Sequence, residues 1–184
     1  MSEDSLIRFA SPTLAGLKTG SLFGYPCKCA EEACRDVREI NHLLSPKGII
    51  ALPLAFQQDR VLLYIYRPAL LRRDLGDPRA RSLLADRGYP LNSMNRCICT
   101  LSGRLKAEGT FPHEIGLFLG YPPEDVEGFV NNKAANFKCS GTWKVYGNEE
   151  KAKAAFNKYR KCTECYVKQH ERGTSLSKLA VSFS

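Results

Sequence analysis

The pair His113–Glu114 is the first candidate for chemistry in this sequence. Both residues follow Pro112 and precede the apolar run IGLFLG, so we expect them in the first turn of a short helix. The positive end of a helix dipole favours a neutral imidazole, the form that acts as a general base or a metal ligand. We therefore take His113 and Glu114 as candidate catalytic residues. The alternatives are a histidine at the surface or the rim of the core, and a Glu114 that only starts the helix, with Thr110 as a cap.

Lys18 and Arg67 are candidates for binding an anion. Lys18 lies between Gly16 and Gly20, which let the backbone approach a ligand closely, and its ammonium group can bind a phosphate or a carboxylate. The spacing is not that of a P-loop, in which the lysine directly follows a glycine. Arg67 precedes Pro68 and is the second candidate for the same anion. Its alternative is a solvated position at a strand end.

Eight cysteines raise the question of metal binding. A reducing cytosol disfavours disulfides, so we expect thiols, core fillers or metal ligands. Cys162 and Cys165 form a CxxC pair on a predicted helix, where the two thiols lie on adjacent turns and can chelate one ion. Together with Cys139 they are the candidate ligands for zinc or iron. The alternative is inert packing, and the lack of a second CxxC pair argues against a standard zinc ribbon.

The strand patterns predict a small antiparallel sheet. Two apolar runs, GIIALPLAF and RVLLYIYRP, predict a hairpin over residues 48–67. Pro53 within the first run predicts an edge strand or a bulge, because proline cannot donate to a strand ladder. We expect a strand near residues 142–146 to join this sheet. The segment 11–26, rich in Gly and Pro, is expected to be an ordered loop.

The helical patterns complete an α+β fold. Apolar residues at helical spacing predict a helix over residues 31–44, and Asn148 caps a long helix that ends near Gly173. With several shorter patterns, we expect about six helices packed with the sheet. The length favours one domain, which we predict over residues 1–184 with a basic C-terminal helical segment at 133–184.

The net charge of +8 is concentrated in that C-terminal segment. Residues 133–184 carry 11 Lys and Arg against 4 Asp and Glu, whereas residues 1–132 carry 16 against 15. Such a basic patch favours an acidic partner protein, for example an electron carrier, because charge complementarity speeds encounters. The alternative is a solvated helix face without a partner.

Nucleic acid is a less favoured partner, and a membrane is not expected. Glu124, Asp125 and Glu127 disfavour DNA recognition by the helix that carries them. Tyr159 and Tyr166 interleave with basic residues, as in RNA-binding proteins, but they fall on the stripe expected to be buried. No apolar run approaches the about 20 residues of a membrane span, and the first ten residues do not resemble a secretory signal. We therefore expect a cytoplasmic protein without membrane insertion.

Four blocks of the sequence carry a resemblance to a family. The blocks are SPTLAGLK, LLYIYRP, FPHEIGLFLGYP and CSGTWKVYG. In them the chain resembles an uncharacterised bacterial family, a domain of unknown function found largely in anaerobic Gram-positive organisms. The resemblance covers almost the whole chain. It implies a single full-length domain of a cytosolic bacterial protein, and it supplies no catalytic residues.

These features favour a ligand-binding or redox or metal-accessory protein that docks an acidic partner. We expect His113, Lys18 and Cys139 to line its polar pocket, with zinc or iron bound through cysteines in the metal-accessory interpretation. The first alternative is an enzyme that acts on an anionic small molecule, with His113 as general base and Lys18 or Arg67 as anion clamp. The second alternative is an RNA-binding module.

Overall fold

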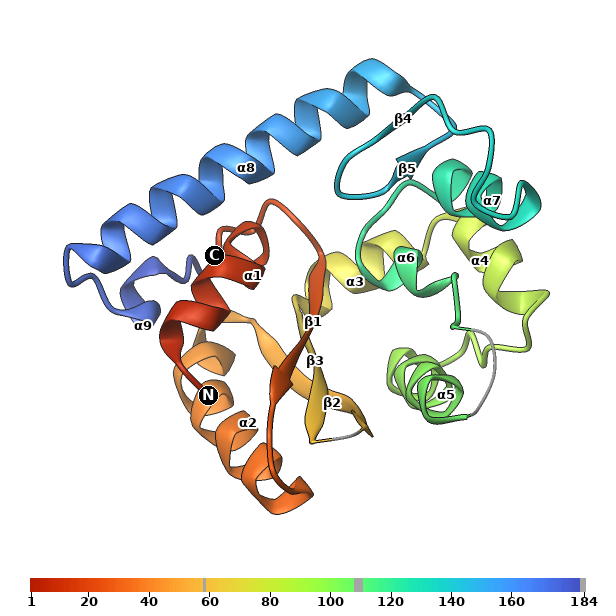
Figure 1. The fold of residues 1–184 in the computed structure, drawn as a ribbon. Helices are drawn as coiled ribbons and strands as arrows, with labels where there is room; N and C mark the ends of the chain where they lie inside the picture. The colour runs from red at the N-terminus through yellow and green to blue at the C-terminus, as the bar shows by residue number, and fades with distance from the viewer. Residues whose placement is uncertain (58, 108–110, 183–184) are drawn as a thin grey trace. The chain divides into compact units, whose positions relative to one another are not determined.

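The computed structural model describes the chain in three ranges: 1–57, 59–107 and 111–182. Two compact units make up the structure (Figure 1): residues 1–71 with 159–184, and residues 72–158. Helices and antiparallel strands occur in both units, so the predicted α+β class is confirmed. The described ranges contain nine α-helices, against about six expected from periodicity. The single domain over residues 1–184 is not tested by this division and stays a prediction.

A three-stranded antiparallel sheet forms the centre of the first unit. Its strands are β1 (Gly20–Pro26), β2 (Ile50–Gln57) and β3 (Arg60–Tyr66). The order is β1, β3, β2, so β3 lies in the middle. The helices packed with this sheet are α1 (Glu3–Leu14), α2 (Ala30–Leu44) and α9 (Leu176–Leu179), and a short 3-10 helix, Ser45–Lys47, follows α2. Figure 1 shows α1 and α2 lying along the sheet.

The alternation of side chains along β3 shows which face of the sheet the helices cover. Val61, Leu63 and Ile65 of β3 lie in the same buried cluster as the apolar residues of α1, α2 and α9. Because strand side chains alternate between the two faces, these three residues mark the helix-covered face. The helix predicted over 31–44 is confirmed as α2. It buries the expected apolar stripe: Ala33, Val37, Ile40 and Leu44.

The hairpin predicted over residues 48–67 is confirmed, because β2 pairs antiparallel with β3. β2 is an edge strand and its register shifts just after Pro53, so both features expected of this proline are present. Residue 58, in the connection, lies outside the described residues. Asn41 of α2 bonds to the backbone N–H and C=O of Ala51 at 2.8 and 2.9 Å. These two hydrogen bonds satisfy backbone groups on the unpaired edge of β2 and hold α2 against that strand.

The segment 11–26 was predicted to be an ordered loop, and this prediction is wrong. Its first residues complete α1, and its last residues form β1, which pairs antiparallel with β3. Pro12 lies inside α1, and Gly16, at a φ of 73°, turns the chain out of the helix toward the strand. The third strand of the sheet is therefore β1. The strand near 142–146 does not belong to this sheet.

Short helices make up most of the second unit. They are α4 (Pro78–Ala85), α5 (Met94–Lys106), α6 (Ile115–Phe118) and α7 (Pro123–Asn131). Helices α3 (Pro68–Leu75) and α8 (Glu149–Glu171) each begin in one unit and end in the other. The strand expected at 142–146 is present as β5 (Lys144–Val145), but it pairs with β4 (Cys139–Ser140) in a separate two-stranded sheet. The prediction that it joins the hairpin is wrong, because pairing across a short turn closes a smaller loop.

Helix α8 has one face more buried than the other, as its sequence predicts. Ala152 is buried, and Phe156 and Tyr159 are half-buried. Lys161 and Lys168 are exposed. The aromatic residues of this helix therefore serve packing, while its basic residues face solvent.

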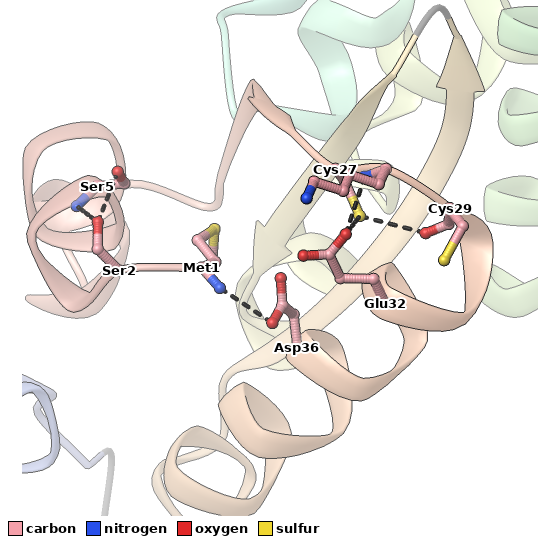
Figure 2. Close-up of polar contacts among 8 residues, drawn as sticks. Met1, Ser2, Ser5, Cys27, Cys29, Glu32 and Asp36 are labelled. Carbon is pink, nitrogen blue, oxygen red and sulfur yellow. Dashed lines mark hydrogen bonds and ion pairs between the residues drawn. The ribbon is translucent and has the colours of Figure 1, made fainter.

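Figure 2 shows a polar cluster between the first residues of the chain and the start of α2. The amino group of Met1 lies 2.9 Å from Oδ1 of Asp36. The Cys27 thiol donates to the backbone oxygen of Cys29 over 3.2 Å and lies 3.8 Å from the Glu32 carboxylate. Burial raises the pKa of the Cys27 thiol, so it acts as a protonated donor. This cluster gives Cys27 a structural role.

Candidate functional site

A cavity of about 490 Å³ lies within the second unit. Small-molecule sites usually span about 300 to 1,000 Å³, so this cavity has the size of a ligand site. Four aromatic rings and two basic side chains line it: Phe111, Tyr121, Phe129, Trp143, His113 and Lys144. The end of β4 and the turn that follows it contribute small residues to the remaining wall: Ser140, Gly141 and Thr142.

Separate segments of the chain bring these rings together. Phe111 and His113 precede α6, and Tyr121 lies in the turn between α6 and α7. Trp143 lies in the β4–β5 turn, and its ring stacks on that of Tyr121 with 4.9 Å between centroids and 29° between planes. Phe156 of α8 packs edge-on against Trp143 at 4.6 Å and 76°. Both are favourable ring geometries, so the position of Trp143 is fixed by two neighbouring rings.

Asp125 fixes the β4–β5 hairpin that carries Trp143. Its Oδ2 accepts the indole N–H of Trp143 at 2.7 Å, and its Oδ1 accepts the backbone N–H groups of Tyr146 and Gly147, both at 2.7 Å. The residue is 3% exposed, and these three bonds offset the loss of water around its charge. Asp125 also lies in the first turn of α7, where the helix dipole favours an anion.

Two glycines allow the close approach of the elements around the cavity. A Cβ added at Gly128 of α7 would collide with the ring of Tyr146. A Cβ added at Gly141 of the β4–β5 turn would collide with the ring of Phe156. Any larger residue at these positions therefore displaces an aromatic side chain beside the cavity.

Lys144 and His113 supply the basic groups of the cavity wall, beside the carboxylate of Asp125. Nζ of Lys144 donates to the backbone oxygen of Ala134 at 2.8 Å and lies 4.7 Å from the ring centroid of Phe137. The His113 ring meets that of Phe129 edge-on, at 4.9 Å and 63°. The wall thus combines stacking surfaces with an ammonium group that is held in position by a carbonyl and a ring.

A second cavity of about 310 Å³ shares Phe111 and His113 with the first. Arg87, Arg104 and Glu114 line it. Nη1 of Arg104 lies 2.9 Å from Oε1 of Glu114, and Nε of Arg87 lies 3.6 Å from Oε2. Arg104 also donates to the backbone oxygen of Arg87. Two guanidinium groups therefore meet one carboxylate, and the cluster keeps a positive charge.

Glu114, a predicted catalytic residue, is buried and paired. It is 5% exposed and accepts a hydrogen bond of 2.9 Å from the hydroxyl of Tyr89 in addition to its contacts with the two arginines. Burial and the nearby carboxylate raise the pKa of Tyr89, so its hydroxyl stays protonated and donates. Glu114 precedes α6 without capping it through its side chain, and Thr110 lies outside the described residues. Catalysis by His113 and Glu114 stays a prediction.

Lys18 and Arg67 lie in the first unit, whereas both cavities lie in the second. Arg67 is fully buried, so the solvated strand end is wrong. Its guanidinium donates to the backbone oxygens of Thr13, Leu14 and Val181 at 2.7, 2.6 and 2.7 Å. The guanidinium is buried because it lies at the C-terminal end of α1, where the last backbone carbonyls carry partial negative charge and need hydrogen-bond donors. Lys18 is 9% exposed, and burial lowers its pKa to about 8. Anion binding by this pair stays a prediction.

The three candidate metal ligands divide between the units. Cys139 lies in β4, next to Ser140 of the cavity wall, whereas Cys162 and Cys165 lie on the part of α8 that belongs to the first unit. Cys162 is half-buried and Cys165 is exposed. Within the described part of the chain, no group of three or more His, Cys, Asp or Glu side chains is arranged to hold a metal ion. Zinc or iron binding stays a prediction, which elemental analysis of protein purified without oxygen tests.

The sequence patterns did not indicate the aromatic wall or the arginine pair. Tyr121 and Trp143 stand in two of the blocks that carry the family resemblance, so the aromatic content of those blocks was the available signal. Arg87 and Arg104 have no such signal, because they are 17 positions apart and meet only around Glu114.

Fold and cavities together define a small α+β protein whose second unit contains a cavity lined in part by aromatic rings. The chain belongs to the family described as "Protein of unknown function (DUF3793)", whose family model matches residues 6–180. This match confirms the resemblance to a domain of unknown function. No curated protein and no solved structure matches the chain. Every helix within the described ranges is too short or too polar to traverse a lipid bilayer.

Proposed function

We propose that this protein binds a small molecule with a planar aromatic ring in the cavity of the second unit. The observation that carries the proposal is the wall of rings around a volume of about 490 Å³, formed by Phe111, Tyr121, Phe129 and Trp143. A mostly apolar cavity with a few polar groups is the usual form of a small-molecule site. Planar ligands gain from stacking on such rings beyond the area that they bury.

Lys144 decides which kind of ligand the cavity favours. Aromatic walls also bind quaternary ammonium groups through cation–π interactions. Here an ammonium group already belongs to the wall, with Nζ of Lys144 5.9 Å from the ring centroid of Phe129. A second cation would be repelled, since like charges in a site of low polarity disfavour each other. The carboxylate of Asp125 also lines the cavity, but it already accepts three hydrogen bonds. The cavity therefore favours a neutral ring over a cationic one.

The single tryptophan of the chain gives the proposal a direct test. Trp143 lines the cavity, so its fluorescence reports on a ligand there. We expect riboflavin or adenosine to change this emission saturably, and calorimetry to give the same Kd. The proposal is wrong if neither probe gives a saturable response.

A matched pair of Phe→Ala variants tests where the probe binds. Phe129→Ala removes one ring of the wall and should weaken binding about tenfold, because stacking contributes about 1 to 3 kcal/mol per ring. Phe56→Ala removes an exposed ring of β2 in the first unit and should leave the Kd unchanged. Equal effects of both variants would contradict the assignment of the site.

An enzyme acting on an anionic small molecule, with His113 as general base, stays the alternative. Its support is that His113 lines both cavities, so a bound ligand contacts the imidazole. The test uses a ligand identified by the titrations. Loss of turnover in His113→Gln with ligand affinity retained would favour the enzyme, and unchanged turnover would exclude His113 as the base.

Docking of an acidic protein remains a proposal for the basic segment 133–184. Its support is the set of exposed basic residues on α8: Lys151, Lys153, Lys158, Arg160, Lys161 and Lys168. We expect salt-sensitive binding to an acidic electron carrier such as a ferredoxin. Lys161→Glu should weaken it, while Lys106→Glu, an exposed change on α5, should not. Binding of single-stranded RNA with a steep salt dependence would favour the RNA-binding alternative instead.

A further inference from the structure

The second cavity, which contains Arg87, Arg104 and Glu114, lies beside the aromatic cavity and differs from it in charge. Phe111 and His113 line both cavities, so the two cavities lie next to each other at these side chains. Four aromatic rings line the first cavity, whereas the lining of the second includes two arginines and a carboxylate. Adjacent sites of this kind suit a ligand with a ring at one end and an anionic group at the other.

The charge balance of the second cavity favours an anion. Glu114 is fully engaged at one oxygen by Tyr89 and Arg104, and its other oxygen faces Arg87. The two guanidinium groups carry about ten N–H donors between them, and the bonds found among the described residues engage only some of these. The side chains of Arg87 and Arg104 are 23% and 40% exposed, so an anion in the cavity can reach them.

The arginines are also held in position before a ligand arrives. The guanidinium of Arg104 lies 4.8 Å from the ring centroid of Tyr89, and Nη1 of Arg87 donates to the backbone oxygen of Leu83 at 2.9 Å. A guanidinium fixed by a ring, a carboxylate and a carbonyl loses little freedom when it binds. Its planar pair of N–H groups matches two oxygens of a phosphate.

We infer that the second cavity binds the phosphate group of a ligand whose ring occupies the first cavity. The ligand class is a ring-bearing phosphate monoester, such as a mononucleotide or flavin mononucleotide. The inference rests on the proposed function, because it takes the ring site as given. His113, at the junction of the two cavities, faces the segment that joins ring and phosphate.

Two matched pairs of probes separate the ring from the phosphate. They are riboflavin with flavin mononucleotide, and adenosine with adenosine monophosphate. The Kd of each probe is measured by Trp143 fluorescence and by calorimetry. In at least one pair we expect the phosphate form to bind about tenfold tighter or more, since hydrogen bonds to charged groups are stronger than neutral ones.

Variants then assign the preference to the arginines. Arg87→Gln should bring the ratio of the two affinities in a pair toward one, while Arg81→Gln, an exposed change on α4, should keep the ratio. Arg104→Gln removes a partner of the buried Glu114 and can impair folding. The double variant Arg104→Gln with Glu114→Gln removes cation and carboxylate together, and it should also lower the ratio.

The outcomes distinguish this inference from the proposed function. Equal affinities within both pairs would overturn the phosphate site and leave ring binding intact. If no member of either pair binds, the ring site and the phosphate site both fail. A preference for the phosphate form that survives in Arg87→Gln and in the double variant would overturn the assignment to the arginine cavity.

Discussion

The indole N–H of Trp143 donates a hydrogen bond of 2.7 Å to Oδ2 of Asp125. The two residues are 18 positions apart in the sequence, and the bond joins α7 to the β4–β5 turn. It holds the tryptophan ring of the cavity wall in one orientation. The aromatic site therefore depends on a buried carboxylate as well as on ring packing.

Asp125→Ala should destabilise the protein by about 3 kcal/mol or more, because it removes the acceptor of three hydrogen bonds to a charged group. The free energy of unfolding in urea measures this effect, and Trp143 emission reports the loss of indole orientation. Glu127→Ala is the matched control, since Glu127 is exposed on the same helix. It should change stability by less than about 0.5 kcal/mol. Similar stabilities of the two variants would contradict the role given to Asp125.

Two Gly→Ala changes in helices should have opposite signs. At Gly128 in α7 the added methyl meets the Tyr146 ring, so we expect a loss of about 1 to 3 kcal/mol from overpacking. At Gly103 in α5 no atom lies within 4 Å of the added methyl. Alanine there should stabilise the protein by up to about 1 kcal/mol through helix propensity. Thermal unfolding of both variants checks the prediction, and a stabilised Gly128→Ala would refute the close contact with Tyr146.

Local patterns in the sequence sufficed for the elements whose partners are near in the chain. Helix α2 and the β2–β3 hairpin follow from periodicity of 3.6 and 2 and from a short connection. Strand β1 was missed because its pairing, which joins Gly20 to Tyr66, is long in sequence and its Gly and Pro suggest a loop. The pairing of β5 with β4 instead of the hairpin depends on competition between partners, which periodicity does not describe.

The predicted site residues stay predictions, but the structure shows which of them lie near one another. His113 lines the two cavities described above, but Lys18 and Arg67 lie in the other unit and line neither of these two. The burial of Arg67 had no local signal, because the carbonyls that compensate it come from α1, from Lys47 and from Val181. From the sequence alone, a single basic residue before a proline is expected to be exposed to solvent. Its burial follows only from the folded arrangement of the segments that supply these carbonyls.

Arg67→Lys should destabilise the protein by about 3 kcal/mol, because an ammonium group has fewer donors and a different shape, and cannot reach all four carbonyls. Urea unfolding measures the loss. Arg60→Lys is the control at the start of β3, where the arginine is exposed and bonds only to Gly24 among the described residues. It should change stability by less than about 1 kcal/mol. If Arg67→Lys is as stable as the control, the bonds to the carbonyls contribute little.

The cysteines should react with iodoacetamide in an order set by burial and pKa. Cys29, Cys34, Cys99 and Cys165 are exposed, whereas Cys27 and Cys97 are buried. Burial also raises the pKa of the two buried thiols, which lowers their reactive thiolate fraction. Mass spectrometry of the peptides at pH 8 over time should show the exposed group modified first. In concentrated urea all eight should react alike, and fast modification of Cys27 in the native state would contradict its burial.

The stability of the protein should depend on pH through Lys18. Burial lowers its pKa to about 8 in the folded state, from 10.5 for an ordinary lysine. Below pH 8 both states carry the proton, so Lys18 adds no slope there. Between pH 8 and 10.5 the unfolded state binds the proton more tightly than the folded state, so stability rises with pH, by at most about 1.4 kcal/mol per pH unit.

Lys18→Met isolates this contribution, because cysteines and tyrosines titrate alike in both proteins. We expect the free energy of unfolding of the wild type, relative to Lys18→Met, to be constant from pH 6 to about 7.5 and to increase from pH 8 to 10. Urea unfolding at each pH measures it. A difference that stays flat across the alkaline range would mean that Lys18 keeps its ordinary pKa in the folded protein. A difference that falls with pH would mean that the fold stabilises the charged form, as it does when an anionic partner compensates the burial.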